Sequence, residues 1–197
     1  MSQPGERLGV RALTLQQPFA AAMAAGIGLY TRRGKPTAFS KGEWVAVHCG
    51  QSEEHLKNAR LMQEIRRAWP ACPTDEALRA GQRSILGLAH FVDGACNAAQ
   101  AAAACPILKH YSCTKPIAWR ADSARACAAP LAYPKGNLQL WHLSKSGFSK
   151  PADCAELLQM ACSTTPSAGR QEGGGGKRKR SEGSEAVSGA NLKAAKR

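Results

Sequence analysis

Apolar and polar residues alternate along short stretches of this chain, and glycine, proline or polar clusters separate the stretches. The first stretch, 12–15, has the period of a half-buried strand. Pro18, a residue suited to the first position of a helix, precedes apolar residues that recur at intervals of four, namely Phe19, Met23 and Ile27. Gly26 can adopt the left-handed backbone that ends such a helix. We therefore expect a strand, a short helix and a second strand within 12–33.

Further strands and helices follow along the chain. Apolar runs bounded by turn-forming residues predict strands at 43–49, 84–93, 109–119, 126–133 and 138–143. Apolar residues at steps of three or four predict helices at 52–69, 75–80, 97–105 and 152–162. Ser52 is the expected N-cap of the longest helix, and Gly87 marks a bulged or closely packed point in its strand. The apolar stripe of the longest helix is formed by Leu56, Ala59, Met62, Ile65 and Trp69.

Basic residues dominate the charge of the chain. There are 27 Lys and Arg against 14 Asp and Glu, a net charge of +13, and residues 1–163 carry +8 of it. A folded region this basic attracts polyanions, of which nucleic acid is the commonest, whereas colloidal solubility is the alternative explanation. The longest predicted helix presents a basic outer face, either solvated or in contact with phosphate groups. This face carries Lys57, Arg60, Arg66 and Arg67.

The cysteines do not follow a metal-binding pattern. The sequence contains 8 cysteines but no Cys-x-x-Cys and no zinc-finger spacing, so we expect neither a metal nor another cofactor. No apolar run reaches the length of a membrane span, and the N-terminus lacks the apolar stretch of a secretory signal. We therefore expect no membrane partner, a reducing compartment and free thiols. Cys113 is the candidate for reactivity, because the nearby Lys115 would lower the pKa of its thiol.

The composition changes at the end of the chain. Ser, Thr, Pro, Gly and charged residues prevail in 163–197, so this tail is expected to be disordered. Two basic clusters in it resemble a bipartite nuclear import signal that an import receptor reads, while a basic tail that grips nucleic acid is the alternative. The clusters contain Lys177, Arg178, Lys179, Arg180, Lys193, Lys196 and Arg197. We expect the protein to reside in the nucleus, with the cytoplasm as a second location.

Four segments resemble, in the same order, the ASCH family of PUA-like domains, which is named after a transcription coactivator homology region. The segments are LTLQQPFAAAMAAGI (13–27), GEWVAVHCG (42–50), SILGLAHFVDG (84–94) and PLAYPKGNLQLWHL (130–143). The resemblance implies an α+β fold, a small mixed β-barrel with flanking helices, over 11–145. A flexible N-terminus at 1–10 and a short helical extension at 146–162 would flank it, and we expect a monomer.

One element of the family differs in this chain. The family's Gly-x-Lys-x-x-Glu-x-Arg reads Gly26-Ile-Gly-Leu-Tyr-Thr-Arg-Arg33, so Gly28 replaces the lysine and Thr31 replaces the glutamate. Small bacterial ASCH proteins that hydrolyse N4-acetylcytidine also carry this threonine, which looks like their nucleophile, but they keep the lysine. A threonine hydroxyl needs an adjacent base to become reactive. Lys35 is the residue that we consider as a substitute base.

Three functions fit these observations. The first, which we favour, is a module that binds RNA or another nucleic acid in transcription coregulation or RNA metabolism, with arginines on phosphate and tyrosines stacked on bases. The second is an amidohydrolase for a modified nucleoside such as N4-acetylcytidine, with Thr31 as nucleophile and Lys35 as base. The third is a protein-interaction module of a transcription coactivator. The nucleic-acid-binding candidates are Tyr30, Arg32, Arg33, Lys35, His48 and Tyr111.

Overall fold

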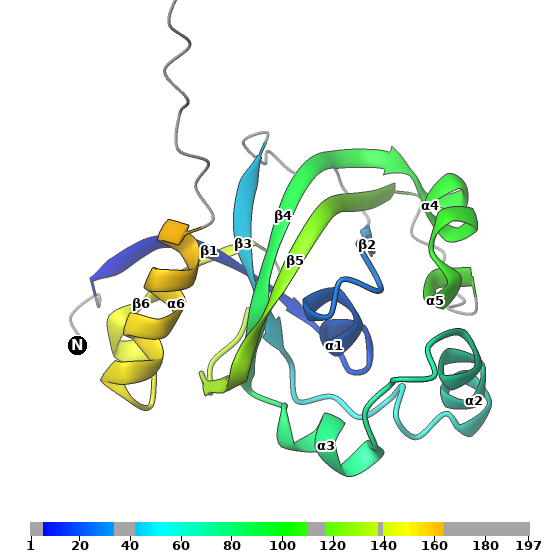
Figure 1. Cartoon of the computed structure of the whole chain (residues 1–197), viewed down its shortest axis with the longest axis horizontal. Coiled ribbons are helices and arrows are strands. Elements are labelled where there is room, and N and C mark those ends of the chain that lie inside the picture. Colours follow the sequence, from blue (N-terminus) through cyan, green and yellow to red (C-terminus); the bar gives the residue numbers. More distant parts are fainter. Residues whose placement is uncertain (1–5, 34–41, 110–116, 138–139, 164–197) are drawn as a thin grey trace, which may run out of the picture. The chain divides into compact units, whose positions relative to one another are not determined.

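A six-stranded mixed sheet forms the centre of the structure (Figure 1). The computed structural model describes residues 6–33, 42–109, 117–137 and 140–163. The strands lie in the order β2-β5-β4-β3-β1-β6, and their bounds are β1 Arg7–Leu15, β2 Tyr30–Arg33, β3 Glu43–Cys49, β4 Ser84–Asn97, β5 Ile117–Ala132 and β6 Trp141–Ser144. The β1–β3 pair is parallel and the other pairs are antiparallel. Within the described strands, the two edge strands β2 and β6 do not pair with each other. The sheet is therefore a curled half-barrel rather than the closed barrel that the resemblance implies.

Helices flank this sheet on both faces. They are α1 Phe19–Ala24, α2 Ala59–Ala68, α3 Asp75–Ala80, α4 Ala98–Ala104, α5 Pro106–Lys109 and α6 Pro151–Ser163, with a 3₁₀ turn at Lys145–Gly147. The short helix α1 lies inside the curve of the sheet, whereas α6 packs on β4 and β5 from the outer side (Figure 1). The structure therefore confirms an α+β fold with flanking helices.

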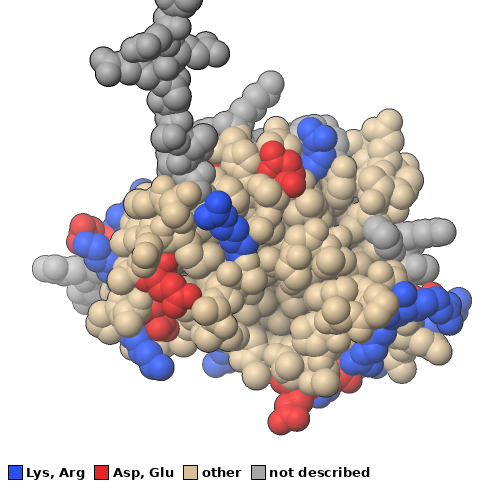
Figure 2. All heavy atoms as spheres, viewed as in Figure 1, with Lys and Arg blue, Asp and Glu red and all other residues tan. Residues whose placement is uncertain are grey.

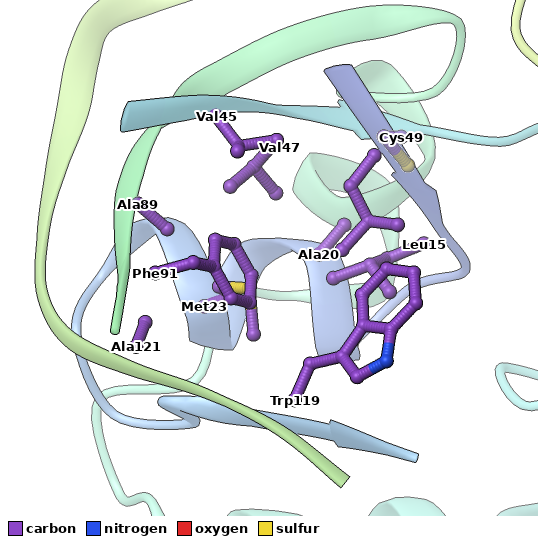
Figure 3. Close-up of a cluster of buried hydrophobic side chains, with 11 residues drawn as sticks. Leu15, Ala20, Met23, Val45, Val47, Cys49, Ala89, Phe91, Trp119 and Ala121 are labelled. Atoms are coloured by element: carbon purple, nitrogen blue, oxygen red, sulfur yellow. The ribbon is translucent and has the colours of Figure 1, made fainter. Parts of the chain in front are cut away.

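The main core lies between α1 and the concave face of the sheet (Figure 3). Odd-numbered residues of β1 and β3 point into it, as the two-residue period of a strand requires. Phe91 of β4 and Trp119 of β5 close the core against Met23 of α1, and all three side chains are buried. The buried members are Leu13, Leu15, Ala20, Met23, Val45, Val47, Cys49, Ala89, Phe91, Trp119 and Ala121.

Even-numbered residues of the same two strands face the outer side of the sheet. Ala12 of β1 and Ala46 of β3 belong there to a second cluster, which Leu157 of α6 covers. Thr14 and His48 share this parity, because they follow Ala12 and Ala46 by two positions along their strands. The outer face thus carries both an apolar cluster and, beyond it, two polar side chains.

The end of α1 follows the sequence prediction closely. Gly26 has φ +74°, and its N–H donates to the Met23 carbonyl at 3.0 Å, while the Ile27 N–H donates to the Ala22 carbonyl at 2.9 Å. These two bonds form a Schellman motif, which the left-handed glycine makes possible. Two details differ from the prediction. Pro18 is the N-cap rather than the first helical residue, and the Ile27 side chain is 42% exposed because the chain has already left the helix.

The longest predicted helix begins later than expected. Asn58, not Ser52, is the N-cap of α2, and its side chain accepts a hydrogen bond from the Leu61 N–H at 3.0 Å. Ser52 instead accepts a bond from the Glu54 N–H at 3.4 Å in the preceding turn. The predicted apolar stripe is buried at Leu56, Met62, Ile65 and Trp69, whereas Ala59 is exposed.

The long hairpin of β4 and β5 differs most from the prediction. We expected two strands at 109–119 and 126–133, but β5 is one strand of 16 residues that pairs with β4 along its length. Gly87 confirms the predicted close approach, since a Cβ there would lie 2.3 Å from the Arg125 carbonyl oxygen and the register shifts beside it. At the N-terminus, β1 already begins at Arg7, within the segment 1–10 that we expected to be flexible. The tail predicted beyond Ser163 lies outside the described residues.

Candidate functional site

The structure places Thr31, the possible nucleophile, and His48, a nucleic-acid-binding candidate, on opposite faces of the sheet. Thr31 of β2 stands opposite Trp119 of β5 in the antiparallel ladder, so it shares that residue's face, the concave one. His48 of β3 lies on the outer face. Thr31 and His48 therefore do not belong to one cleft.

Thr31 has no base among the described residues. Its side chain is only 6% exposed, and no described Lys, His, Asp or Glu side chain hydrogen-bonds to its hydroxyl. Gly28, which replaces the family's lysine, packs on Ala22, where a Cβ would approach the Ala22 Cβ to 3.3 Å. Lys35, the substitute base that we considered, lies outside the described residues.

The remaining candidates around β2 are placed only in part. Tyr30 is half-buried and packs against a cluster formed by α1, α2 and α5, so its ring is a packing element at this place. For Arg32 and Arg33 the structure describes the backbone, which pairs with Ala118 and Ile117 of β5. Tyr111 lies outside the described residues, as does Cys113, for which we expected a reactive thiol.

A cavity of about 520 Å³ opens where β1 and β3 end on the outer face. Four chain segments meet there: the ends of β1 and β3, the residue before β4 and the loop after β5. The described lining residues include hydroxyl, imidazole, amide and cationic side chains but no carboxylate. The lining residues are Thr14, His48, Gly50, Gln51, Arg83, Pro134, Lys135, Gly136 and Asn137.

Thr14 and His48 meet directly in this cavity. They are Cα partners in the parallel β1–β3 pair, and the Thr14 Oγ1 lies 3.2 Å from the His48 Nδ1. The His48 Nε2 lies 3.0 Å from the Tyr133 carbonyl oxygen, and the Trp141 Nε1 lies 3.2 Å from the Thr14 Oγ1. A buried polar group is costly to leave without a partner, and in this network each of these atoms has one.

The chemistry of the partners fixes where the hydrogens lie in this network. A carbonyl oxygen only accepts, so the His48 Nε2 carries a hydrogen and Nδ1 of the neutral ring is an acceptor. An indole N–H only donates, so Trp141 donates to Thr14. The Thr14 hydroxyl therefore uses its own hydrogen to donate to the His48 Nδ1.

The imidazole is held on several sides and is neutral near pH 7. His48 is 2% exposed, and the rings of Trp141 and Tyr133 stand edge to face with it, at centroid distances of 5.6 and 6.2 Å. Burial lowers the pKa of His48, and the hydrogen bond to the Tyr133 carbonyl opposes that shift. Gly136 lies against the ring, since a Cβ on Gly136 would fall 2.4 Å from the His48 Cε1. Glycine is thus the residue that lets the loop approach this histidine.

Two cations face the cavity without a neutralising carboxylate. Arg83 has a left-handed backbone, with φ 55°, and it clamps two segments because its N–H donates to the Cys49 carbonyl and its carbonyl accepts from the Tyr133 N–H, both at 2.9 Å. Its Nε donates to the Gln51 Oε1 at 3.1 Å, which orients the guanidinium without cancelling its charge. Lys135 is exposed on the facing loop. Within the described part of the chain, neither residue forms an ion pair.

Six other described cations are paired with carboxylates, so their charge is compensated locally. What distinguishes Arg83 and Lys135 from the remaining described cations is that both line the cavity. The other cations without an ion pair among the described residues are Arg7, Arg60, Arg120, Arg125 and Lys150. Figure 2 shows Lys and Arg scattered among Asp and Glu on the face that it draws, without one continuous basic surface there. The paired cations are Arg11 with Glu43, Lys57 and Arg79 with Glu53, Arg66 with Asp75, Arg67 with Glu64, and Lys145 with Glu6.

Sequence reasoning identified His48 but missed most of its surroundings. In the sequence, Thr14 is only a polar position in a predicted strand, and 134–137 only separates two predicted strands. A signal was present in the Pro-Lys-Gly-Asn of that loop, because a glycine next to a lysine suits a close backbone approach beside a cation. Nothing in the sequence pattern placed Arg83 beside this loop.

The chain was also compared with known proteins. No protein-family model matches it, and no curated protein matches it. Within the described residues, no three His, Cys, Asp or Glu side chains lie close enough together to hold a metal ion. No described helix has the length and apolar character needed to cross a membrane.

Proposed function

We propose that this chain is a nucleic-acid-binding module of the ASCH type that takes one nucleotide of single-stranded RNA into the cavity beside His48. The observation that carries the proposal is that, among the described residues, Arg83 and Lys135 have no ion pair and the cavity that they line has no carboxylate. Such a site favours an anion, and phosphate is the anion that a guanidinium held in a fixed orientation recognises well.

The form of the cavity supports a nucleotide rather than a bare phosphate. Its volume, about 520 Å³, falls within the few hundred to about a thousand cubic ångströms that is usual for small-molecule sites. Gln51 and Asn137 add amide groups to the wall, and amides are able to read the edge of a base. The net charge of +8 over residues 1–163 would draw the rest of an RNA strand toward the domain.

The assignment to the ASCH family rests on four sequence segments and on the curled α+β sheet that they build. We infer that the half-barrel corresponds to the PUA-like barrel of that family, and that the tail serves nuclear import. The second candidate function, hydrolysis of an acetylated nucleoside, needs a base beside Thr31, and none of the described residues provides one. For the third candidate, a protein-interaction module, a cavity of uncompensated positive charge offers no particular support.

Binding of labelled single-stranded RNA to the full chain, followed by fluorescence anisotropy at several salt concentrations, tests the proposal. The double variant Arg83→Ala/Lys135→Ala should weaken binding about tenfold at physiological salt and flatten the salt dependence, because phosphate contacts release counterions. The matched control is Lys57→Ala/Arg66→Ala, which removes the same charge from two ion-paired positions outside the cavity. Both proteins keep the basic tail, so its contribution is common to them.

The alternative site from the sequence supplies a further arm of the same experiment. Arg32→Ala/Arg33→Ala changes the two arginines of β2, an edge strand of the sheet, whereas residues of β1 and β3 line the cavity. If this variant loses affinity while the Arg83→Ala/Lys135→Ala variant does not, RNA binds at β2 and the cavity is not the site. Equal, small losses in all three double variants would show that binding follows net charge alone, which also contradicts the proposal.

A further inference from the structure

We propose that Thr14 and His48 act as a nucleophile and its base, and that the cavity transfers acyl groups from donors whose leaving group carries phosphate. This would be a catalytic activity in addition to RNA binding. The inference starts from the 3.2 Å distance between the Thr14 Oγ1 and the His48 Nδ1, an arrangement in which a base can activate a neighbouring hydroxyl.

The direction of the proton is already set for this chemistry. The Tyr133 carbonyl requires a hydrogen on the His48 Nε2, which leaves Nδ1 as the acceptor for the Thr14 hydroxyl. Trp141 donates its indole hydrogen to the Thr14 oxygen from another side. That donor would stabilise negative charge on the oxygen as the hydroxyl proton leaves, although it also lowers the nucleophilicity of the neutral hydroxyl.

The base is held in place as such pairs require. The Tyr133 carbonyl fixes the tautomer and the ring plane, which is the part that an orienting group plays beside a general base. The imidazole is packed between aromatic rings and the Gly136 backbone, so few other orientations are open to it. Its lowered pKa keeps the ring neutral, and therefore able to accept a proton, near pH 7.

The phosphate of the donor would be bound by groups in the same cavity. Arg83 and Lys135 line the wall that also contains Thr14 and His48, and their charge is uncompensated within the described residues. They would hold a phosphate-bearing leaving group and stabilise the charge that develops on it as its bond to the acyl carbon breaks.

The reaction balances without an additional reagent apart from water. The Thr14 oxygen attacks the acyl carbon, its proton passes to the His48 Nδ1, and the acyl–oxygen bond to the phosphate-bearing group breaks. The departing phosphate oxygen takes this proton from His48, so the leaving group is released as hydrogen phosphate or its ester and the imidazole is neutral again. Water, activated by the same imidazole, then hydrolyses the Thr14 ester to a free carboxylic acid and regenerates the hydroxyl.

Acetyl phosphate is the simplest probe of this inference. The full chain should release inorganic phosphate and acetate from it, and rapid acid quenching followed by peptide mass spectrometry should find an acetyl group on Thr14. Thr14→Val, which keeps the shape of the side chain, should abolish the adduct, whereas Thr14→Ser should retain it. His48→Gln should lower the rate about 100-fold, within the range usual for loss of a general base. Ser123→Ala removes an exposed hydroxyl elsewhere on β5 and is the control.

The outcomes separate this inference from the proposed RNA binding. Wild-type protein that forms no acetyl-Thr14 and leaves acetyl phosphate at its spontaneous rate overturns the inference, whatever the variants do. The network would then serve only to anchor the loop 134–137, and RNA affinity that depends on Arg83 and Lys135 would be untouched. Conversely, acetylation of Thr14 in a protein that does not bind RNA would support this inference and contradict the proposed function.

Discussion

The hydroxyl of Thr14 lies 3.2 Å from Nδ1 of His48, although the two residues are 34 positions apart in the chain. The parallel pairing of β1 with β3 makes them direct partners on one face of the sheet. The loop after β5 then covers them, with Gly136 against the imidazole. The strand register and the loop glycine together fix the positions of Thr14 and His48, which form the polar centre of the cavity.

Removal of the indole donor should weaken this centre measurably. Trp141→Phe keeps an aromatic ring but deletes the Nε1–H that donates to the Thr14 Oγ1 at 3.2 Å. We expect the free energy of unfolding to fall by about 1 kcal/mol, the usual net contribution of one hydrogen bond. Urea titration measures this change. In the double variant Trp141→Phe/Thr14→Val, the loss of unfolding free energy should differ from the sum of the two single losses by about 0.5 kcal/mol or more. A double-variant loss equal to that sum would show that the bond contributes nothing.

A methyl group on the loop glycine should disturb the histidine. In Gly136→Ala the new Cβ would fall 2.4 Å from the His48 Cε1 and 3.0 Å from the Thr14 Oγ1, so the loop must move away. We expect a loss of about 1–3 kcal/mol in unfolding free energy, typical of overpacking. Lys135→Ala, next to it in the same loop, should change stability by less than about 0.5 kcal/mol. Similar stabilities for the two variants would show that the loop adapts without cost.

Stability should fall as the pH drops below neutrality. Burial lowers the folded-state pKa of His48, so the unfolded chain binds the extra proton first as the pH falls through its ordinary value of 6.5. This contribution is therefore fully present above that pH and is lost as the pH falls through the lower folded-state pKa. Tyr133 stacks edge to face on the ring, and Arg83 and Lys135 line the same cavity.

Urea unfolding at pH 7.5 and pH 5.5 measures this dependence. His48→Gln should reduce the difference between the two values. The pKa of His55 is also lowered by burial, so His55→Gln is the control that separates its share from that of His48. An unchanged difference in the His48→Gln protein would contradict the prediction.

The cysteines should differ sharply in their reactivity. Burial raises the pKa of the Cys49 and Cys127 thiols to about 12, whereas Cys162 near the end of α6 is exposed. Because the thiolate is the reactive form, iodoacetamide at pH 8 should label Cys162 more than tenfold faster than the other two. Peptide mass spectrometry after timed quenching gives the three rates. In urea the rates should converge, and fast labelling of Cys49 in the native protein would contradict the burial found for it.

The basic tail should direct nuclear import. Residues 173–197, fused to a reporter too large to diffuse through nuclear pores, should carry it into the nucleus, because two basic clusters match the acidic grooves of an import receptor. Replacement of Lys177, Arg178, Lys179 and Arg180 by alanine should leave the reporter in the cytoplasm. Import that persists in that variant would show that the first cluster is not the signal.

Local patterns were sufficient for several elements of this fold. The apolar run within 43–49 and the glycines that flank it predicted β3 with its bounds, and Thr74 with two acidic residues after it marks the beginning of α3. Gly26 ended α1 because its left-handed backbone is a local property of a residue without a side chain. In each of these places the neighbours along the chain carry the whole physical reason.

Tertiary pairing decided the elements whose local signal was weak. The middle of β5, with Asp122, Ser123 and several alanines, has little strand propensity of its own, yet pairing with β4 makes it one continuous strand. The beginning of α2 was misplaced because Ser52 and Asn58 are equally good caps. Leu56 lies in the turn before α2, and its side chain is buried there. Its spacing from Met62 and Ile65 therefore extended the predicted apolar stripe to a residue outside the helix.

The sequence by itself determined that a basic α+β domain contains a histidine at the end of a buried strand. It also supplied the glycines that permit close approaches. Only the tertiary structure decided what surrounds that histidine. Strand register brings Thr14 to it, while a left-handed residue and the loop after β5 bring Arg83 and Lys135 to the same cavity. These are contacts between residues distant in the chain, and no local periodicity encodes which distant segments will meet.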